Sequence, residues 1–358
     1  MTIRPGQNYI DIDLQKERPA VNGYIVGFRP GLVYADNGKS PNVGVVHLHH
    51  AVWLVGDSLL KLKPTFAAGE EKTYVNAPPG FGWRYTTDQA WVINHMIHDL
   101  TGSEQKVYLT YTLWFIPDSA PQAASTIPID TQWMDVEGIK PYPVFDVKRG
   151  SGTKGVFTFP DQAKNPYPDG VIRNKWVADR DATLVTTAGH LHPGGLWTDL
   201  DITRDGKTVR LFRSRAQYYE KAGPVSWDVS MSATGPNWKI AIKKGDVLST
   251  NAAYETKDAS WYEVMGIMVV GITKDAQGGV DPFTGTVDQT DYLTHGRLPE
   301  NKDTNPGSYN PAYANAIRLR PGPLVSKVVI KNFAFSQGDM LQRGTKGQPA
   351  TVDRRAHV

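Results

Sequence analysis

Short strand-like segments, separated by turn-forming residues, run along most of the chain and restrict its fold class more than any other feature. The 358 residues include 34 Gly and 25 Pro, which punctuate these segments. The stretches Val43–Val55, Lys106–Ile116 and Glu263–Ile272 are rich in aliphatic, β-branched and aromatic side chains, which favour strands. No long amphipathic helical pattern accompanies them. The sequence therefore predicts an all-β fold of sandwich-like domains.

Neighbouring strand-like segments predict three hairpins. The segments expected to pair are 90–97 with 106–116, 197–202 with 208–212, and 238–242 with 247–254. The dipeptide Asp205-Gly206 in the second of them is a strong signal for a tight turn. A break in the pattern at Pro117–Gln122, together with the chain length, favours two domains. We expect an N-terminal β-sandwich over residues 1–122, a C-terminal one over 123–340, and a polar tail over 341–358.

Composition excludes several functional classes. The chain carries 39 Lys and Arg against 36 Asp and Glu, so its net charge gives no case for nucleic acid or a membrane surface as partner. No apolar run is long enough to span a bilayer. The absence of cysteine excludes disulfides, thiolate zinc sites and a cysteine nucleophile. The sequence also lacks a nucleophile elbow, a P-loop and a dinucleotide-binding glycine motif.

The N-terminal residues lack the apolar segment of a signal peptide. We expect a secreted or periplasmic protein whose signal peptide is absent from this chain, with a cytoplasmic location as the alternative.

Seven of the nine histidines fall into three groups on predicted strands. The groups are His47, His49 and His50; His95 and His98; and His190 and His192. Residues two apart in a strand face the same side, so His190 and His192 present two imidazoles to one point. A single strand histidine is usually structural, but three groups favour metal binding.

The residues around these groups favour copper over other metals. Few carboxylates lie nearby, mainly Asp99, Asp199 and Glu263, which disfavours an iron site of the two-histidine, one-carboxylate type. Imidazole combined with a thioether suits copper, and Met265 lies on an apolar strand. The alternative interpretation of Met265 is a core side chain.

The candidate ligands occur in a definite order along the chain. They are His49 and His50 in Val-His-Leu-His-His-Ala-Val-Trp, His98 in Met-Ile-His-Asp-Leu, the His190-Leu-His192 motif, and Met265 in Glu-Val-Met. In this order the chain resembles the ascorbate-dependent type II copper monooxygenases, which include peptidylglycine α-hydroxylating monooxygenase and dopamine β-monooxygenase. The Pro79–Gly82 loop and the Lys244–Leu248 stretch also match, and the resemblance covers roughly residues 20–275.

The resemblance implies two copper ions with separate tasks. His49, His50 and His98 would hold an electron-transfer copper, and His190, His192 and Met265 would hold the catalytic copper that binds O₂. It also implies two jelly-roll-like antiparallel β-sandwich domains facing each other across a cleft, and ascorbate or another one-electron donor as reductant. The expected activity is hydroxylation of a C–H bond in a small-molecule substrate.

Two ligand assignments stay open in the sequence. His47 can replace His49 or His50, because strand alternation puts His47 and His49 on one face and His50 on the other unless a bulge intervenes. His95 is the alternative to His98, which we prefer because it precedes a turn, as the family's histidine does at its strand end.

The chain departs from the peptide-hydroxylating members at three substrate positions. Those members use an Arg two residues before the His-x-His motif, and an Asn and a Tyr after the copper-binding Met. The corresponding residues are Ala188, Ile267 and Val269. A substrate carboxylate facing this pocket would lose its charge-assisted hydrogen bonds. We therefore expect an apolar or aromatic substrate and no peptide amidation.

Two other functions compete with the monooxygenase. A copper-binding or electron-transfer β-protein without oxygenase turnover would use the same ligands. A carbohydrate-binding or structural β-protein is favoured by the 10 Trp and 16 Tyr residues, and its histidines would be incidental. The sequence does not predict the oligomeric state.

Overall fold

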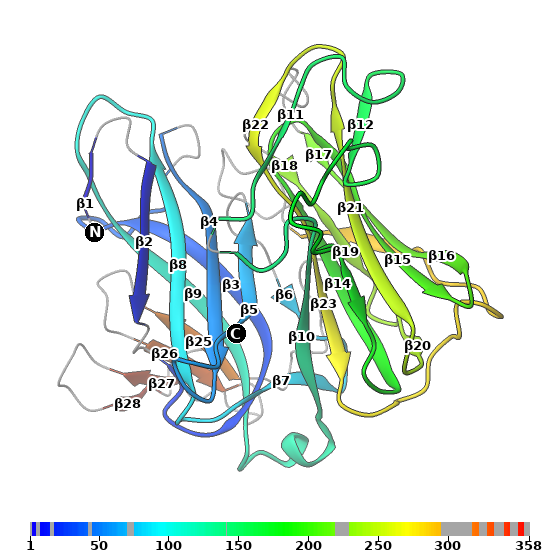
Figure 1. Cartoon of the computed structure of the whole chain (residues 1–358). Coiled ribbons are helices and arrows are strands. Elements are labelled where there is room, and N and C mark those ends of the chain that lie inside the picture. The colour runs from blue at the N-terminus through cyan, green and yellow to red at the C-terminus, as the bar shows by residue number, and fades with distance from the viewer. Residues whose placement is uncertain are drawn as a thin grey trace. The chain divides into compact units, whose positions relative to one another are not determined.

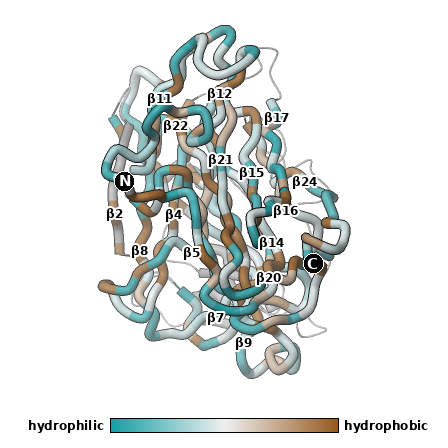
Figure 2. The backbone as a smooth tube through the Cα atoms, turned by 45° about the vertical axis from the view of Figure 1, so that its right-hand side comes forward, coloured by the Kyte–Doolittle hydropathy of each residue, from teal (hydrophilic) through white to brown (hydrophobic). Residues whose placement is uncertain are grey.

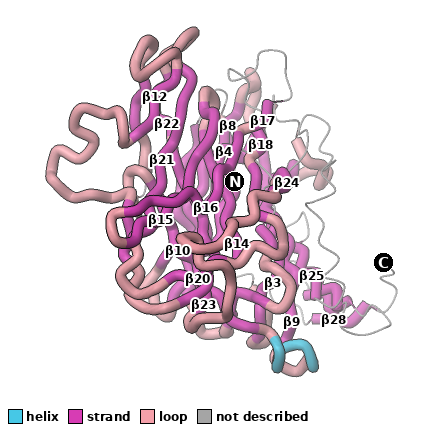
Figure 3. The backbone as a smooth tube through the Cα atoms, turned by 90° about the vertical axis from the view of Figure 1, so that its right-hand side faces the viewer, coloured by secondary structure: helices cyan, strands magenta, loops and turns pink. Residues whose placement is uncertain are grey.

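The computed structural model is all-β, as the sequence predicts, and consists of several mainly antiparallel sheets (Figure 1). It describes residues 2–4, 8–14, 18–41, 45–69, 75–140, 142–218 and 229–294, and the strands 317–321, 328–332, 340–343 and 350–353. The one helical element within these ranges is a 3₁₀ turn, η1 (Pro121–Ser125), visible among the strands in Figure 3. The chain forms two compact units, Met1–Ile129 with Leu298–Val358, and Asp130–Arg297.

This division differs from the expected 1–122, 123–340 and 341–358. The first boundary falls within strand β10 (Ile127–Asp135), and the chain beyond residue 297 returns to the first unit. There β25 (Ile317–Pro321) pairs with β9 (Gln105–Pro117). The expected tail carries β27 (Met340–Arg343) and β28 (Ala350–Asp353), which extend the same sheet through β26 (Val328–Asn332). An open sheet edge recruits a strand from any part of the chain, so the local sequence does not predict this return.

Unit 1 is built from two sheets. The first has the order β7-β3-β9-β25-β26-β27-β28, with β1 on β9 and β6 on β3. Its remaining strands are β1 (Thr2–Ile3), β3 (Gly23–Tyr34), β6 (Val75–Asn76) and β7 (Phe81–Tyr85). The second sheet has the order β2-β8-β4-β5, formed by β2 (Asn8–Leu14), β4 (Val46–Gly56), β5 (Lys63–Gly69) and β8 (Ala90–Asp99).

Aromatic rings from both sheets fill the interior of unit 1. Phe28 of β3 stacks on Phe66 of β5 with ring centroids 4.7 Å apart, and meets Trp53 of β4 edge-on at the same distance. Tyr111 of β9 lies 5.6 Å from Phe28. Rings of this size exclude water over a large area and hold the two sheets face to face.

Unit 2 also contains two large groups of paired strands. One contains β24-β19-β14-β23-β10, with β20 on β14. Its strands are β14 (Ala182–Leu191), β19 (Ser232–Thr234), β20 (Ile240–Ile242), β23 (Gly266–Thr273) and β24 (Asp291–Leu293). The other contains β12-β21-β15-β16, with β13 on β21, and comprises β12 (Val156–Phe159), β13 (Lys175–Val177), β15 (Gly195–Arg204), β16 (Lys207–Arg215) and β21 (Val247–Glu255).

Two short ladders complete unit 2. They are β11 (Phe145–Val147) with β22 (Trp261–Val264), and β17 (Gln217–Tyr218) with β18 (Val229–Ser230). Leu184 and Met268 from one large sheet and Leu200 and Phe212 from the other belong to one buried core. Hydrophobic stretches lie within strands such as β21, whereas loops near β11 and β12 are mostly hydrophilic (Figure 2).

Of the three predicted hairpins, one is confirmed and two are wrong. Strands β15 and β16 pair across Asp205 and Gly206, which have φ angles of 50° and 75°. Strands β8 and β9 belong to different sheets, and so do β20 and β21. In both cases the connection carries the chain from one sheet to the other. Strand patterning identifies the strands correctly but does not distinguish a hairpin from such a crossing.

Gly189 allows the two large sheets of unit 2 to approach closely beneath the His190 motif. A Cβ atom at this position would lie 2.5 Å from Ser214 Cβ and 2.5 Å from Thr198 Cγ2, on the opposing sheet. Neither neighbour is the far end of a flexible side chain. The strand that carries His190 and His192 is therefore fixed against the opposing sheet at the residue before His190.

Replacing Gly189 tests this close packing. We expect Gly189→Ala to destabilise the protein by about 1–3 kcal/mol, because overpacked cores must shift backbone or side chains. Gly235→Ala is the matched control, since its nearest contacts would be an ordinary 3.4 Å or more. Calorimetric melting should show a lower midpoint for Gly189→Ala alone, and equal midpoints for the two variants would contradict the packing account.

Candidate metal centres

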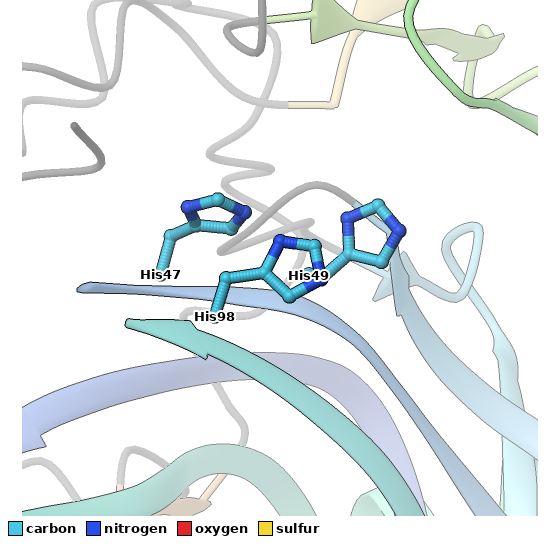
Figure 4. Close-up of side chains that lie close together, drawn as sticks. All are labelled: His47, His49 and His98. Carbon is cyan, nitrogen blue, oxygen red and sulfur yellow. The ribbon is translucent and has the colours of Figure 1, made fainter. Parts of the chain in front are cut away.

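Backbone register brings three histidines of unit 1 together. His47 of β4 lies directly opposite His98 of β8. The register then shifts between Leu48 and His50, so His49 is the extra residue of a bulge. The His49 ring lies beside the other two, and all three project from the β4–β8 pair in Figure 4.

The three imidazoles are close enough to share one metal ion. Ring centroids lie 4.7 Å apart for His47 and His98, 4.4 Å for His49 and His98, and 6.1 Å for His47 and His49. One ring nitrogen from each residue lies within 4.8 Å of the others, and all three residues are buried. Nitrogen ligands sit about 2 Å from a metal, so modest side-chain rotations would complete the site.

Burial also gives this cluster the protonation state that metal binding requires. Desolvation lowers the pKa of His98 to about 4, so its imidazole is neutral at pH 7. A neutral imidazole keeps a lone pair for a metal, whereas a protonated one has none.

The structure adds His47, the alternative ligand, to this site. His47 completes a group with His49 and His98, and His50 also offers a ring nitrogen within 4.8 Å of one from His49. His50 pairs with Met96, and its ring lies 5.2 Å from that of His49. His95 pairs with the fully buried Ala51 and lies on the opposite face of β8 from His98, toward the interior.

In unit 2, strand alternation places the other predicted residues on one face. Ala188 pairs with Val269, and His190 pairs with Ile267. The intervening Met268 belongs to the buried core, so these four side chains share the face directed away from the core. The structure therefore brings His190 together with the predicted substrate residues Ala188, Ile267 and Val269.

Met265 lies at a break in the strand that the sequence predicts as continuous. Strand β22 ends at Val264 and pairs with β11, while β23 begins at Gly266 and pairs with β14. Glu263 has a φ of 53°, which redirects the chain. Met265 is 3% exposed. The Tyr254 hydroxyl accepts the His192 N–H at 3.1 Å and donates to the Met265 carbonyl at 2.6 Å, so the backbones of these two residues lie close together.

Hydrogen bonding fixes the ring of His192. Its Nδ1 lies 2.9 Å from the carbonyl oxygen of Glu263. A carbonyl only accepts, so Nδ1 carries the proton and the lone pair belongs to Nε2. This is the common arrangement of metal-binding histidines, whose second nitrogen donates to a backbone or carboxylate oxygen.

His190 supplies the second imidazole of unit 2. Burial lowers its pKa to about 4, so this imidazole is also neutral at pH 7. Its Nε2 is buried and makes no hydrogen bond within the described part of the chain. Such an atom is costly to bury unless something binds it, and a metal ion would satisfy it. The ring centroids of His190 and His192 are 5.3 Å apart.

Sequence analysis missed one buried acid close to this site. Asp135 of β10 is 1% exposed, and the N–H of the next residue, Val136, donates to Gly266 O at 3.0 Å. Burial raises the pKa of Asp135 to about 8, opposed by hydrogen bonds from Glu137 N–H and Trp133 Nε1. The local sequence does not predict that Asp135 is buried, because its burial depends on how the strands of unit 2 pack together.

Two comparisons with known proteins found no match. No protein-family model matches the chain, and a search of curated proteins returned no match. No helix in the described ranges has the length and apolarity to cross a membrane.

The raised pKa of Asp135 predicts a pH-dependent stability difference. The folded state holds this proton more tightly than the unfolded state, whose pKa is about 3.9. The associated stabilisation is therefore present below pH 4 and is lost as the pH rises toward 8. Asp135→Asn removes the titration, so the variant should gain stability relative to wild type between pH 5 and pH 8. Melting both proteins across this range checks the claim, and a constant difference would refute it.

Single histidine substitutions test which residues form the unit 1 site. We expect His47→Ala, His49→Ala and His98→Ala each to abolish binding of one copper ion, because each removes one of three converging nitrogens. His50→Ala should change the copper content little, and His95→Ala controls for removal of a buried imidazole that faces the interior. Copper per protein is measured by elemental analysis after gel filtration. Copper loss in His50→Ala, with retention in His47→Ala, would restore the set favoured by the sequence.

Proposed function

We propose that the protein is a copper-dependent monooxygenase. It would hydroxylate a C–H bond of a small apolar or aromatic substrate, using O₂ and electrons from ascorbate or another one-electron donor. The observation that carries this proposal is the donor set of unit 2. There, His190 is a neutral imidazole, His192 is held through Nδ1, and the buried Met265 shares the Tyr254 hydroxyl with the His192 backbone. The three-imidazole cluster of unit 1 supports it as a second site.

The chemistry of both donor sets fits copper. The cluster of His47, His49 and His98 contains no carboxylate, and the chain has no cysteine to favour zinc. Imidazole and thioether are the ligands that suit copper, and a thioether favours the reduced ion. Copper, when bound, would supply the one-electron redox chemistry that O₂ activation requires.

The residues of each unit then have defined tasks. In unit 1, His47, His49 and His98 would hold an ion that stores an electron. In unit 2, His190, His192 and Met265 would hold the ion at which O₂ reacts. The carbonyl of Glu263 keeps the proton of His192 on Nδ1, so Nε2 is the atom presented for binding.

The face around His190 supports the proposed substrate class. Ile267 lies directly opposite His190, and the Ala188–Val269 pair lies two residues along the same face. None of these side chains offers a hydrogen bond or a charge, so a substrate carboxylate there would lose water without compensation. We propose on this basis that peptide amidation is not the reaction of this protein.

A copper-binding or electron-transfer protein without turnover is the second candidate. The same ligands serve both functions, and the apolar face is the observation that favours the enzyme. A pure electron carrier has no need of an apolar surface beside a thioether-containing site, whereas an apolar substrate needs one.

Removing the sulfur of Met265 tests the proposal. We expect Met265→Leu to fold, because the swap conserves volume, and to abolish ascorbate-driven O₂ consumption that depends on substrate. Met231→Leu is the matched control, a methionine at 5% exposure in the second core of unit 2. O₂ uptake is followed electrochemically with a panel of apolar and aromatic C–H donors. If Met265→Leu changes neither the O₂ uptake nor the copper content, Met265 is not a copper ligand and the assignment is contradicted.

A further inference from the structure

Three polar groups of His192, its backbone N–H, its backbone carbonyl and its Nδ1, have partners within unit 2. Its backbone N–H donates to the hydroxyl of Tyr254 at 3.1 Å, and its carbonyl accepts from Gly195 N–H at 3.0 Å. Its Nδ1–H donates to Glu263 O at 2.9 Å. The residue is therefore held in position and in tautomeric form by the protein alone.

The hydroxyl of Tyr254 joins the two segments that carry the ligands. This side chain is fully buried. Its oxygen accepts the N–H of His192 and donates its single proton to the carbonyl of Met265 at 2.6 Å. One atom thus sets the spacing between the end of β14 and the break between β22 and β23. Neither segment can shift without losing a buried hydrogen bond.

Glu263 adds a second constraint through its backbone. Its φ of 53° lies in the left-handed region, which non-glycine residues rarely occupy and which persists only where the surroundings hold it. Here Asp146 Oδ1 accepts the Glu263 N–H at 3.0 Å, and Tyr142 donates to Glu263 Oε2 at 3.2 Å. This conformation directs the Glu263 carbonyl toward His192.

We propose that Tyr254 and Glu263 are positioning residues that preset His192 and Met265 as a ligand pair before a metal binds. Neither contacts the metal, and each acts through a ligand. The inference rests on the proposed function, because it assumes that His192 and Met265 are ligands. Its physical basis is that outer hydrogen bonds fix the ring orientation and tautomer of a ligand and so raise its affinity for metal.

The tautomer of His192 in the metal-free protein provides a first test. Long-range ¹H–¹⁵N NMR should show His192 protonated on Nδ1 in wild type. Glu263→Gly should keep this signature, since glycine adopts φ of 53° without penalty. Glu263→Val should lose it, because a β-branched residue does not tolerate that conformation. If Glu263→Val retains a pure Nδ1–H tautomer, the role of Glu263 is refuted.

Copper affinity provides the second test. We expect Tyr254→Phe to weaken Cu(I) binding at one of two sites by about tenfold or more, the usual effect of removing an outer partner, and to leave the other site unchanged. Tyr167→Phe is the matched control, because it also removes a buried hydroxyl that donates to a backbone carbonyl, that of Val136, at 2.7 Å. Competition with a chromophoric Cu(I) chelator reports both affinities.

The outcomes separate this inference from the proposed function. If His192→Ala and Met265→Leu lower Cu(I) affinity while Tyr254→Phe binds copper within twofold of Tyr167→Phe, positioning is refuted and the ligand assignment stands. If His192→Ala and Met265→Leu leave the copper affinity unchanged, the ligand assignment fails and the inference fails with it. If Glu263→Gly keeps the His192 tautomer that Glu263→Val loses, the backbone conformation at residue 263 positions His192, and the Glu263 carboxylate does not.

Discussion

Backbone register in two antiparallel strand pairs decides which side chains of this protein can meet. Side chains alternate along a strand, so one additional residue moves every later side chain to the other face. In the β4–β8 pair His47 lies opposite His98, and a bulge at His49 sets His50 opposite Met96, on the face of β8 that carries His98. In the β14–β23 pair the register is regular from Thr186 to Leu191, and it sets His190 against Ile267.

Burial then determines the chemistry of the assembled sites. Desolvation holds the pKa values of His98 and His190 at about 4, so both rings are neutral ligands at physiological pH. The buried Nε2 of His190 makes no hydrogen bond within the described part of the chain and so costs folding free energy. A bound metal would offset that cost, and the metal-loaded protein should be the more stable form.

Much of this arrangement follows from the sequence, and the rest depends on long-range contacts. The all-β class, the β15–β16 hairpin and the shared face of Ala188, His190, Ile267 and Val269 follow from alternation and turn chemistry. The bulge at His49 does not, because nothing in Val-His-Leu-His-His specifies which residue is extra. The left-handed Glu263 and the bridging Tyr254 also escape local reasoning, since distant residues hold them.

The same limit explains the errors in strand pairing and in the domain boundaries. The alternation of hydrophobic residues predicts which face of a strand is buried, but it does not predict which other strand pairs with it. Strands β8 and β9 follow each other in sequence and lie in different sheets, whereas β25 reaches β9 from far along the chain. The unpaired N–H and C=O groups at a sheet edge can pair with a strand that is distant in sequence.

X-ray absorption at the copper edge of the fully reduced, copper-loaded protein tests the central claim most directly. Three imidazoles at one site, and two imidazoles with a thioether at the other, predict a first shell of nitrogen with one sulfur for every two copper ions. A spectrum with this sulfur contribution supports two separate sites with the proposed ligands. A first shell of nitrogen and oxygen alone, at full copper loading, would contradict the account.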